Sequence, residues 1–168
     1  MSIRRATAAD ARAIADVHVR TWQAAYRHVF PAEVLDSLSV DEREERWQDH
    51  LGGRVTAWVA ETDGRIVGFV SVGPSRTEDD EGELYAIYVL PESWGSGAAP
   101  ELMAAAKDWF AQEGFATAML WVLVDNPRAR RFYEREGWRL DGSRVDPVRG
   151  VEVEEALYRL ELVSGSAL

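Results

Sequence analysis

The sequence predicts an α/β (α+β) fold: one domain with a mixed central sheet of about six or seven strands, flanked by about four or five helices. Two observations carry this prediction. Runs of β-branched and aromatic residues alternate with longer amphipathic segments, and glycine, proline or capping residues separate them. A length of 168 residues is enough for one sizeable hydrophobic core. We therefore assign residues 1–162 to a single domain.

The elements of the first half follow from caps and spacing. Residues 2–5 form a short strand, and a helix begins at Thr7 because Asp10 stands three residues later in a capping-box arrangement. Four side chains then recur at four-residue spacing along one side of this helix: Ile14, His18, Trp22 and Tyr26. Two helical pieces and a β-hairpin turned at Asp63-Gly64 are predicted next, at residues 31–37, 40–51, 55–61 and 65–73.

Glycine and proline set the boundaries in the middle of the chain. A strand over residues 83–90 stops at Pro91, and a helix over residues 98–113 is followed by Gly114 as its C-terminal cap. Residues 117–124 are apolar or β-branched without alternation. This pattern is typical of a central strand that is covered on both faces.

The last part of the chain is expected to hold one capped helix and two strands. Asn126 is a favourable N-cap, Pro127 suits the first helical position, and the helix ends at Gly137. Two closing strands complete the sheet, at about residues 138–144 and 151–160. The final residues, 163–168, are expected to form a frayed C-terminus.

The composition excludes several classes of protein. The chain has no cysteine, which rules out disulfides, a thiol nucleophile and Cys-ligated zinc. Its three histidines are scattered, so no metal site is expected. The net charge of −10 opposes nucleic acid and favours a cationic small molecule. The longest apolar run, residues 119–124, is too short to cross a membrane, and no signal peptide is evident, so we expect a cytoplasmic protein without a membrane partner.

The segment between the strand at 83–90 and the following helix is rich in small residues. It reads WGSGAA over residues 94–99. Small residues let a ligand approach the backbone, and the first turn of a helix offers free N–H groups with a partial positive charge. The segment is a candidate phosphate or pyrophosphate site, the alternative being a purely structural turn. It is no Walker loop, and Pro100 stands where a dinucleotide fingerprint has its third glycine.

A second motif covers residues 126–138 and reads NPRARRFYEREGW. Phe132 and Tyr133 fall on neighbouring turns of one helix together with Ala129 and Glu136. Taken alone, this pattern is more often that of an amphipathic helix whose aromatic side chains pack into the core. Phe132 is expected to pack in this way. Tyr133 is singled out by what the glycine-rich segment implies.

Together the two motifs resemble those of the GNAT superfamily of N-acetyltransferases in their order and spacing. The family's cofactor motif (Gln or Arg, two residues, Gly, one residue, Gly or Ala) matches Trp94, Gly97 and Ala99. Its second motif matches Asn126, Phe132, Tyr133, Gly137 and Trp138. The order of strands and helices is similar over nearly the whole chain. Trp94 departs from the usual residue, and Ser96 and Pro100 reduce the cationic contacts, so a lower cofactor affinity is expected.

The resemblance implies acetyl-CoA as cosubstrate, without a metal. It assigns cofactor contacts to Tyr88, Val89, Trp94, Gly95, Gly97, Ala98, Ala99, Asn126, Arg131 and Tyr133. The amides of residues 95–99 would hold the pyrophosphate, and the strand end at residues 88–89 would pair with the pantetheine arm. Asn126 would contact that arm, Arg131 would reach a phosphate, and Tyr133 would hydrogen-bond the thioester sulfur.

Two residues are candidates for acid–base catalysis. A phenol such as that of Tyr133, with a pKa near ~10, can protonate a departing thiolate whose conjugate acid lies near ~8.5. A lysine-like ammonium must first lose its proton, which costs roughly 4 to 5 kcal/mol at pH 7. Glu83 stands where many family members send a Glu toward the acceptor, and it is the candidate base. The alternative is that Glu83 belongs to the acidic loop that begins at Glu78.

The first helix carries the candidates for acceptor binding. Trp22 and Tyr26 are similar to residues of one large bacterial branch of the family, in which this helix overhangs the acceptor cleft. They would shape the amine pocket, although aromatic residues at helical spacing more often pack in a core. His18 is expected to be a packing or surface residue.

The resulting hypothesis is acetyl transfer to a primary amine by direct attack in a ternary complex. The absence of cysteine excludes a Cys acyl-enzyme, and no Gly-x-Ser-x-Gly elbow is present for a serine one. The alternative is a non-catalytic acyl-CoA-binding sensor or regulatory module; a nucleotide-binding protein ranks last. The acceptor stays open among polyamines, amino acids, aminoglycosides, peptide N-termini and lysine side chains, because a fold does not specify its substrate. The resemblance also leaves a homodimer open.

Overall fold

The computed structural model describes residues 1–162, so the frayed C-terminus expected at residues 163–168 lies outside the described residues. The strands are β1 (Ser2–Arg5), β2 (Thr56–Thr62), β3 (Arg65–Pro74), β4 (Gly82–Val89), β5 (Thr117–Leu123), β6 (Arg139–Val148) and β7 (Val151–Glu161). The α-helices are α1 (Ala11–Ala25), α2 (Ala32–Asp36), α3 (Val40–Leu51), α4 (Ala98–Gln112) and α5 (Pro127–Arg135). Short 3-10 turns, Ala8–Asp10 and Pro91–Ser93, precede α1 and follow β4.

All the strands belong to one mixed sheet, as predicted. The strand order is β1-β2-β3-β4-β5-β7-β6. Neighbouring strands are antiparallel except β4 and β5, which run parallel in the middle of the sheet. The position of β5 between β4 and β7 agrees with its unbroken apolar sequence, because a central strand is covered on both faces.

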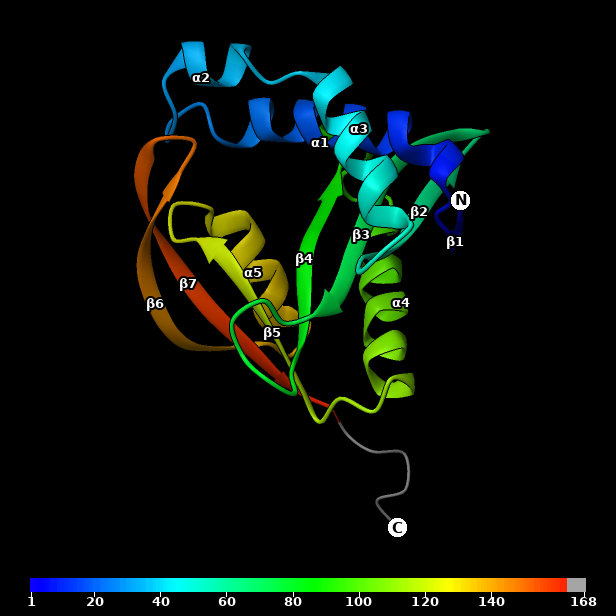
Figure 1. Ribbon diagram of the computed structural model, residues 1–168, viewed down its shortest axis with the longest axis vertical. Helices are drawn as coiled ribbons and strands as arrows, with labels where there is room; N and C mark the ends of the chain where they lie inside the picture. Colours follow the sequence, from blue (N-terminus) through cyan, green and yellow to red (C-terminus); the bar gives the residue numbers. More distant parts are fainter. Residues whose placement is uncertain (163–168) are drawn as a thin grey trace.

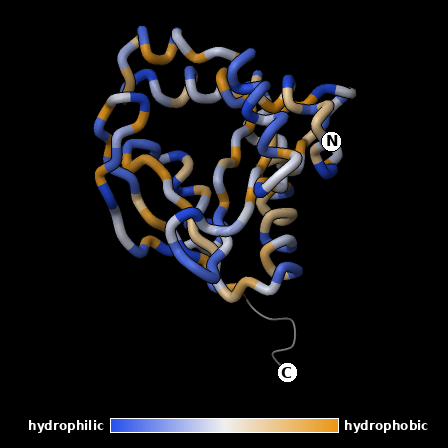
Figure 2. The backbone as a smooth tube through the Cα atoms, in the orientation of Figure 1, coloured by the Kyte–Doolittle hydropathy of each residue, from blue (hydrophilic) through white to orange (hydrophobic). Residues whose placement is uncertain are grey.

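The helices cover both faces of the sheet (Figure 1). On one face, Phe69 of β3 packs against Trp47 of α3 at 5.1 Å between ring centroids and against His18 of α1 at 5.9 Å. On the other face, a Cβ placed on Gly68 would lie 3.4 Å from Leu102 of α4. Neighbouring residues of a strand point to opposite faces, so α1 and α3 lie opposite α4. Figure 2 shows the loop between β3 and β4 as hydrophilic, in agreement with a solvated connection.

Glycine caps end α4 and α5 as the sequence predicts. Gly114 has φ 83°, and the N–H of Phe115 donates to the carbonyl of Phe110 at 3.1 Å. Gly137 has φ 95°, and the N–H of Trp138 donates to the carbonyl of Tyr133 at 3.0 Å. Both ends therefore form Schellman motifs, which need a left-handed residue that glycine adopts without strain.

Two boundaries differ from the sequence-based expectation. The first helix begins as a 3-10 turn, and α1 ends at Ala25, so Tyr26 lies just beyond the helix. β6 continues to Val148 rather than ending near residue 144, because Arg149 (φ 47°) and Gly150 (φ 77°) make a two-residue hairpin turn into β7. The left-handed geometry of both turn residues suits a tight hairpin.

The centre of the sheet splays open between its two parallel strands. Along β3, Ser71 is paired with Ala86 but Val72 with Leu84, so Tyr85 forms a bulge in β4. The pairing of β4 with β5 is limited to Gly82–Ala118 and Glu83–Met119. A bulge bends and twists its strand, which explains why β4 leaves β5 beyond this point. The divergence of the two strands is visible in Figure 1 and leaves an opening in the sheet between β4 and β5.

Candidate active site

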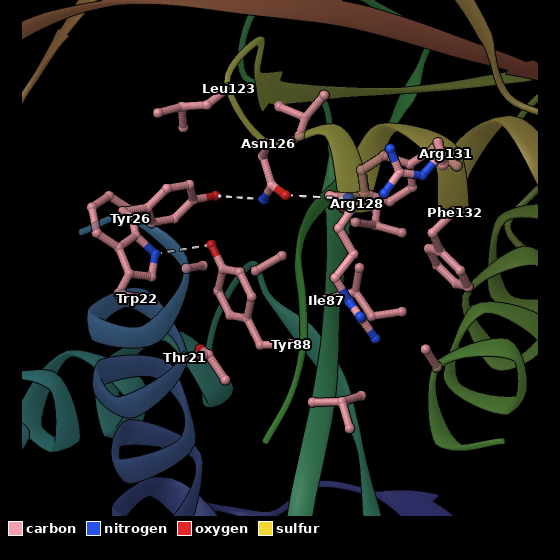
Figure 3. A pocket seen from close by; sticks show the side chains of 18 of the residues that line it. Thr21, Trp22, Tyr26, Ile87, Tyr88, Leu123, Asn126, Arg128, Arg131 and Phe132 are labelled. Carbon is pink, nitrogen blue, oxygen red and sulfur yellow. Dashed lines mark hydrogen bonds between the residues drawn. The ribbon is translucent and has the colours of Figure 1, made fainter. Parts of the chain in front are cut away.

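A cavity of about 920 Å³ fills the opening between β4 and β5 (Figure 3). The cavity is lined by every residue that the sequence singled out for a site: Trp22, Tyr26, Glu83, Tyr88, Val89, Trp94, Gly95, Gly97, Ala98, Ala99, Asn126, Arg131 and Tyr133. These residues come from α1, β4, the turn before α4, and α5. The fold thus brings the predicted residues together at one place.

The glycine-rich turn presents free N–H groups at the N-terminus of α4. Gly95 and Gly97 have φ values of 79° and 90°, which a residue with a Cβ rarely adopts. Within the described chain, the N–H groups of Gly95, Gly97 and Ala99 donate no hydrogen bond, and that of Ala98 reaches only Ser96 Oγ at 3.4 Å. These donors and the positive end of a 15-residue helix form an anion-binding turn.

Trp94 and Arg128 meet across the mouth of this half of the cavity. The guanidinium carbon of Arg128 lies 3.7 Å from the centroid of the Trp94 ring, and the indole Nε1 donates to the carbonyl of Val89 at 2.9 Å. The Trp94 side chain remains 44% exposed. The stack joins the turn before α4 to the first turn of α5, and Arg128 extends toward the cleft in Figure 3. Sequence reasoning did not assign Arg128 a role.

The edge of β4 that faces the cavity has free backbone groups. The N–H of Leu90 donates to the carbonyl of Val67 at 2.8 Å, and antiparallel hydrogen bonds skip every second residue. The backbone of Tyr88 is therefore paired with Phe69 of β3, whereas Ile87 and Val89 point their backbone groups to the open edge, where only the Val89 carbonyl is occupied, by the Trp94 indole. Tyr88 reaches the cavity through its side chain instead. An extended ligand can pair with this edge as an additional strand does.

Asn126 links α5 to the end of α1. Its Oδ1 accepts the N–H of Ala129 at 3.1 Å as the N-cap, and its Nδ2 donates to the Tyr26 hydroxyl at 3.1 Å. Trp22 Nε1 donates to the Tyr88 hydroxyl at 3.0 Å. Figure 3 shows these side chains along one wall of the cavity. Burial raises the pKa of Tyr26 and of Tyr88, and both phenols therefore remain neutral.

Tyr133 points its hydroxyl into the cavity from α5. The side chain is 7% exposed, and its hydroxyl makes no hydrogen bond with any residue in the described range. Burial raises the pKa of this phenol above its ordinary value. Tyr133 is therefore a protonated donor without an acceptor, on a helix that is fixed at both ends.

The arginines of α5 diverge. Arg131 lines the cavity together with Arg128 and Arg135. Arg130 points away and donates to the Tyr158 hydroxyl at 3.1 Å and to the carbonyl of Val124 at 3.3 Å. Three arginines of α5 therefore face the cavity, and Arg130 instead fixes α5 to the neighbouring strands.

Glu83 lies at the closed end of the cavity, where β4 and β5 are still paired. It is 1% exposed, and both of its oxygens accept hydrogen bonds from Arg76, from the backbone N–H at 3.0 Å and from Nη2 at 2.7 Å. The Arg76 guanidinium also lies 4.7 Å from the centroid of the Tyr85 ring. Glu83 is thus a buried carboxylate rather than part of the solvated loop, and an arginine caps it.

His18 packs behind the acceptor wall. Its ring lies 5.3 Å from Tyr88 and 6.2 Å from Trp47 between centroids, and its Nδ1 is buried without a partner in the described residues. Burial, reinforced by the charges of Arg43 and Arg149, lowers the pKa of His18 to about 3. The histidine is a neutral packing residue, one of the two roles that the sequence left open.

A second buried carboxylate in the cavity, Glu155 of β7, was missed by sequence reasoning. Its Oε1 accepts from Arg144 Nε of β6 at 3.0 Å. The Arg144 guanidinium lies 3.9 Å from the centroid of the Trp121 ring. No motif surrounds these residues, and only the strand pairing Arg144–Glu155 brings them together.

This fold is that of an acetyltransferase family. The model of the Acetyltransferase (GNAT) family matches residues 14–138, and the chain therefore belongs to the GNAT family. The Bacillus subtilis protein called uncharacterized N-acetyltransferase YuaI is 37% identical over 131 residues, which span 76% of this chain and 74% of that protein. The chain is an acyltransferase of this family.

Solved structures with a bound cofactor share the fold. The structure of yncA from Salmonella typhimurium with its cofactor acetyl-CoA has a TM-score of 0.76 at 21% identity and covers 100% of this chain and 97% of that chain. PaiA N-acetyltransferase from Thermoplasma acidophilum in complex with coenzyme A has a TM-score of 0.75 at 18% identity, over 96% and 99% of the two chains. In residues 1–162, no helix is long and apolar enough to span a membrane.

Proposed function

We propose that the protein transfers the acetyl group of acetyl-CoA to a primary amine by direct attack in a ternary complex. The observation that carries this proposal is the convergence of three features in one cavity. These features are the free amides at Gly95 and Gly97, the open backbone edge formed by Ile87 and the N–H of Val89, and the hydroxyl of Tyr133, which has no partner in residues 1–162. They match the three chemical parts of acetyl-CoA: its pyrophosphate, its amide-bearing arm and its thioester.

The cofactor half fits acetyl-CoA in shape and charge. A Cβ at Gly95 would meet no atom within 4 Å, and one at Gly97 would meet only Met1 Cε at 4.0 Å, so the turn is open on its ligand side. Arg131 and Arg128 add positive charge for phosphates, and the second N–H of the Asn126 amide is available to the pantetheine arm. The remaining assigned contacts are Tyr88, Trp94, Ala98 and Ala99. When bound, acetyl-CoA supplies an acetyl group that is activated as a thioester.

Tyr133 stabilises the departing sulfur by donating a hydrogen bond. Its raised pKa keeps the phenol protonated at neutral pH. Complete proton transfer from an ordinary phenol to a thiolate of pKa ~8.5 is already uphill by about 2 kcal/mol, and burial adds to this cost. The hydroxyl therefore acts as a preorganised hydrogen-bond donor, and the released thiolate takes its proton from water as solvent re-enters the cavity.

Glu83 accepts the proton of the acceptor amine, directly or through water. It is the carboxylate nearest the point where β4 leaves β5, and the cavity reaches it. Arg76 must share or release the carboxylate when the amine arrives, and its exposed side chain on the loop after β3 makes such movement feasible. Trp22 and Tyr26 form the aromatic wall along which the acceptor enters.

A thermal-shift titration with acetyl-CoA tests the proposal, with CoA, ATP and NAD as comparisons. At about 100 times the dissociation constant, a ligand adds roughly 2.7 kcal/mol, which raises the melting midpoint of a domain of this size by roughly 5 to 10 °C. We expect this shift with both CoA species and not with ATP or NAD. Release of free CoA thiol in the presence of an amine panel then measures turnover. No shift with either CoA species would refute the proposal.

A further inference from the structure

Glu155 carries a carboxylate oxygen that nothing in the described chain satisfies. The residue is 8% exposed, and its Oε1 is bound by Arg144 Nε. Its other oxygen, Oε2, receives no hydrogen bond from residues 1–162, although the side chain lines the cavity. This oxygen is open to the cavity rather than enclosed by protein atoms, so it is available to a ligand that binds there.

The two buried carboxylates point to the same side of the sheet. Glu83 lies opposite Met119 of β5, and Glu155 lies opposite Leu123 of the same strand. Residues four apart along a strand face the same way, and their directly paired neighbours share that face. Four residues span about 13 Å along a strand. Glu83 and Glu155 therefore stand at two separate points of one cavity.

The two carboxylates differ in the charge that surrounds them. Glu83 and Arg76 neutralise each other, and both Glu83 oxygens are occupied. Arg144 is shared between Glu155, at 3.0 Å, and Asp146, whose Oδ2 lies 3.7 Å from its Nη2. Three carboxylates (Glu83, Glu155 and Asp146) against two guanidinium groups (Arg76 and Arg144) leave this group of residues with one net negative charge, and the charge of Glu155 also acts on Arg76.

The charge of Glu155 acts on the opposite wall of the cavity. Burial is the main cause of the raised pKa of Tyr26 and of Tyr88, and the negative charge of Glu155 adds to both shifts. Glu155 therefore faces the aromatic wall that borders the acceptor half. Arg144 lies over the Trp121 ring and is hydrogen-bonded to Oε1 alone.

We propose that Glu155 binds a cationic group of the acceptor other than the amine that reacts, so that the acceptor is a diamine or an amine bearing a guanidinium. This inference rests on the proposed acetyl transfer. An amine held as an ammonium ion by a carboxylate has no free lone pair and cannot attack. The group on Glu155 is therefore a second cation, and the neutral amine lies toward Glu83 and Tyr133. Aromatic faces around both points suit cationic ligands.

Substrate series of matched length test this assignment. The probes are α,ω-diamines from 1,4-diaminobutane to 1,8-diaminooctane, with the amino alcohols and amino acids of equal length. For the best chain length, we expect kcat/KM of the diamine to exceed that of the amino alcohol by about tenfold, the size of one partly buried charge pair. The amino acid, which brings a negative charge to Glu155, should be the poorest acceptor.

The Glu155→Gln variant identifies the residue responsible. Gln keeps the shape and a bond to Arg144 but lacks the charge, so KM for the diamine should rise about tenfold and the preference for the diamine over the amino alcohol should disappear. Glu154→Gln is the matched control, because Glu154 is exposed on the opposite face of the same strand. A diamine preference that survives in Glu155→Gln, or a wild-type preference for the amino alcohol or amino acid, would overturn the proposal.

A binding measurement separates this inference from the proposed function. The melting midpoint of the CoA-saturated protein is followed while the best diamine is added. A rise in the wild type that disappears in Glu155→Gln supports the site even where turnover is slow. No rise in the wild type refutes it. If acetyl-CoA itself does not raise the midpoint, the acetyl transfer is refuted instead. The diamine is then titrated into the protein without CoA, and the same comparison of wild type and Glu155→Gln tests the site.

Discussion

In the proposed reaction, the two halves of the cavity recognise their ligands with different parts of the chain. The cofactor half uses main-chain groups, which are the amides of Gly95 and Gly97 and the open edge at Val89. The acceptor half uses charged side chains, Glu83 and Glu155, each held by an arginine. Backbone groups have the same chemistry whatever residue carries them. Side chains set the charge and spacing of the ligand, so only the acceptor half can be re-specified by single substitutions.

The comparison also separates the expected kinetic effects. Changes in the acceptor half should alter the use of the amine and leave cofactor binding intact. Changes in the cofactor half should alter the affinity for CoA, or the loss of its thiolate, for every amine alike.

The largest effect is expected from Glu83→Gln, which removes the base but retains an acceptor for the Arg76 N–H. Positioned bases contribute at least about 100-fold, so kcat should fall by about that factor. The stabilisation by acetyl-CoA in a thermal-shift assay should be unchanged. Glu78→Gln, on the exposed loop before β4, is the control and should retain full activity. Equal rates for the two variants would show that Glu83 is not the base.

Tyr133→Phe should have the next largest effect, and it probes the cofactor half. A hydrogen bond to a charged group contributes about 1.5–3 kcal/mol, so its loss should lower kcat about 30-fold with every amine. The Tyr133 hydroxyl has no partner among residues 1–162, and the melting midpoint should therefore not fall.

Tyr158→Phe provides the contrasting control. The Tyr158 hydroxyl donates to Glu134 at 2.8 Å and accepts from Arg130 at 3.1 Å, on the side of α5 away from the reaction. This variant should lose about 1 kcal/mol of stability and keep its kcat. A Tyr133→Phe enzyme with wild-type kcat would remove Tyr133 from the mechanism.

The fold could be predicted because its boundary signals are local. Asn126 caps α5, Gly114 and Gly137 end their helices, and Asp63-Gly64 turns the hairpin, each within a few residues of the element it bounds. The extent of β6 could not be predicted in this way. Gly142 and Pro147 interrupt its pattern, and pairing with β7 alone extends it to Val148.

The residues of the site also differ in whether they could be predicted from local sequence. The proposed anion-binding turn and α5 are continuous segments, and their two motifs together resemble those of the family. Arg76, Arg144 and Glu155 come from a loop and two strands without a motif, and their meeting depends on strand register. A single sequence does not contain that register. From the sequence, the preference of the acceptor half for a cation could therefore be predicted only from the overall net charge of the chain.

His18, which packs behind the aromatic wall of the acceptor half, should make the free energy of unfolding depend on pH. The pKa of His18 is lowered from 6.5 to about 3 in the native state. Between these two pH values, the unfolded chain binds a proton at His18 and the folded chain does not. The free energy of unfolding should then decrease as the pH falls below about 6.5. At pH 5.5 the loss from this residue is about 1.4 kcal/mol.

Denaturant titrations of the wild type and His18→Leu between pH 7.5 and pH 5.5 measure this loss. Leucine keeps an apolar side chain in the cluster and removes the titrating group. The difference in unfolding free energy between the two proteins should therefore shift by about 1.4 kcal/mol in favour of the variant at the lower pH. Parallel pH profiles would mean that His18 titrates normally in the folded protein.

The smallest expected effect concerns the Trp94–Arg128 stack at the mouth of the cofactor half. An exposed cation–π contact is worth about 0.5–1 kcal/mol, so Trp94→Ala should weaken CoA binding about threefold and leave kcat at saturation unchanged. Arg128→Ala should lose at least as much affinity, because it also removes a positive charge near the phosphates, and the double variant should lose little more than Arg128→Ala. Isothermal titration of CoA into the four proteins measures this cycle. If Trp94→Ala instead binds CoA more tightly, the indole bond to the Val89 carbonyl competes with the cofactor for the open edge of β4. The stack would then be a barrier to binding, and even this half of the cavity would depend on a side chain.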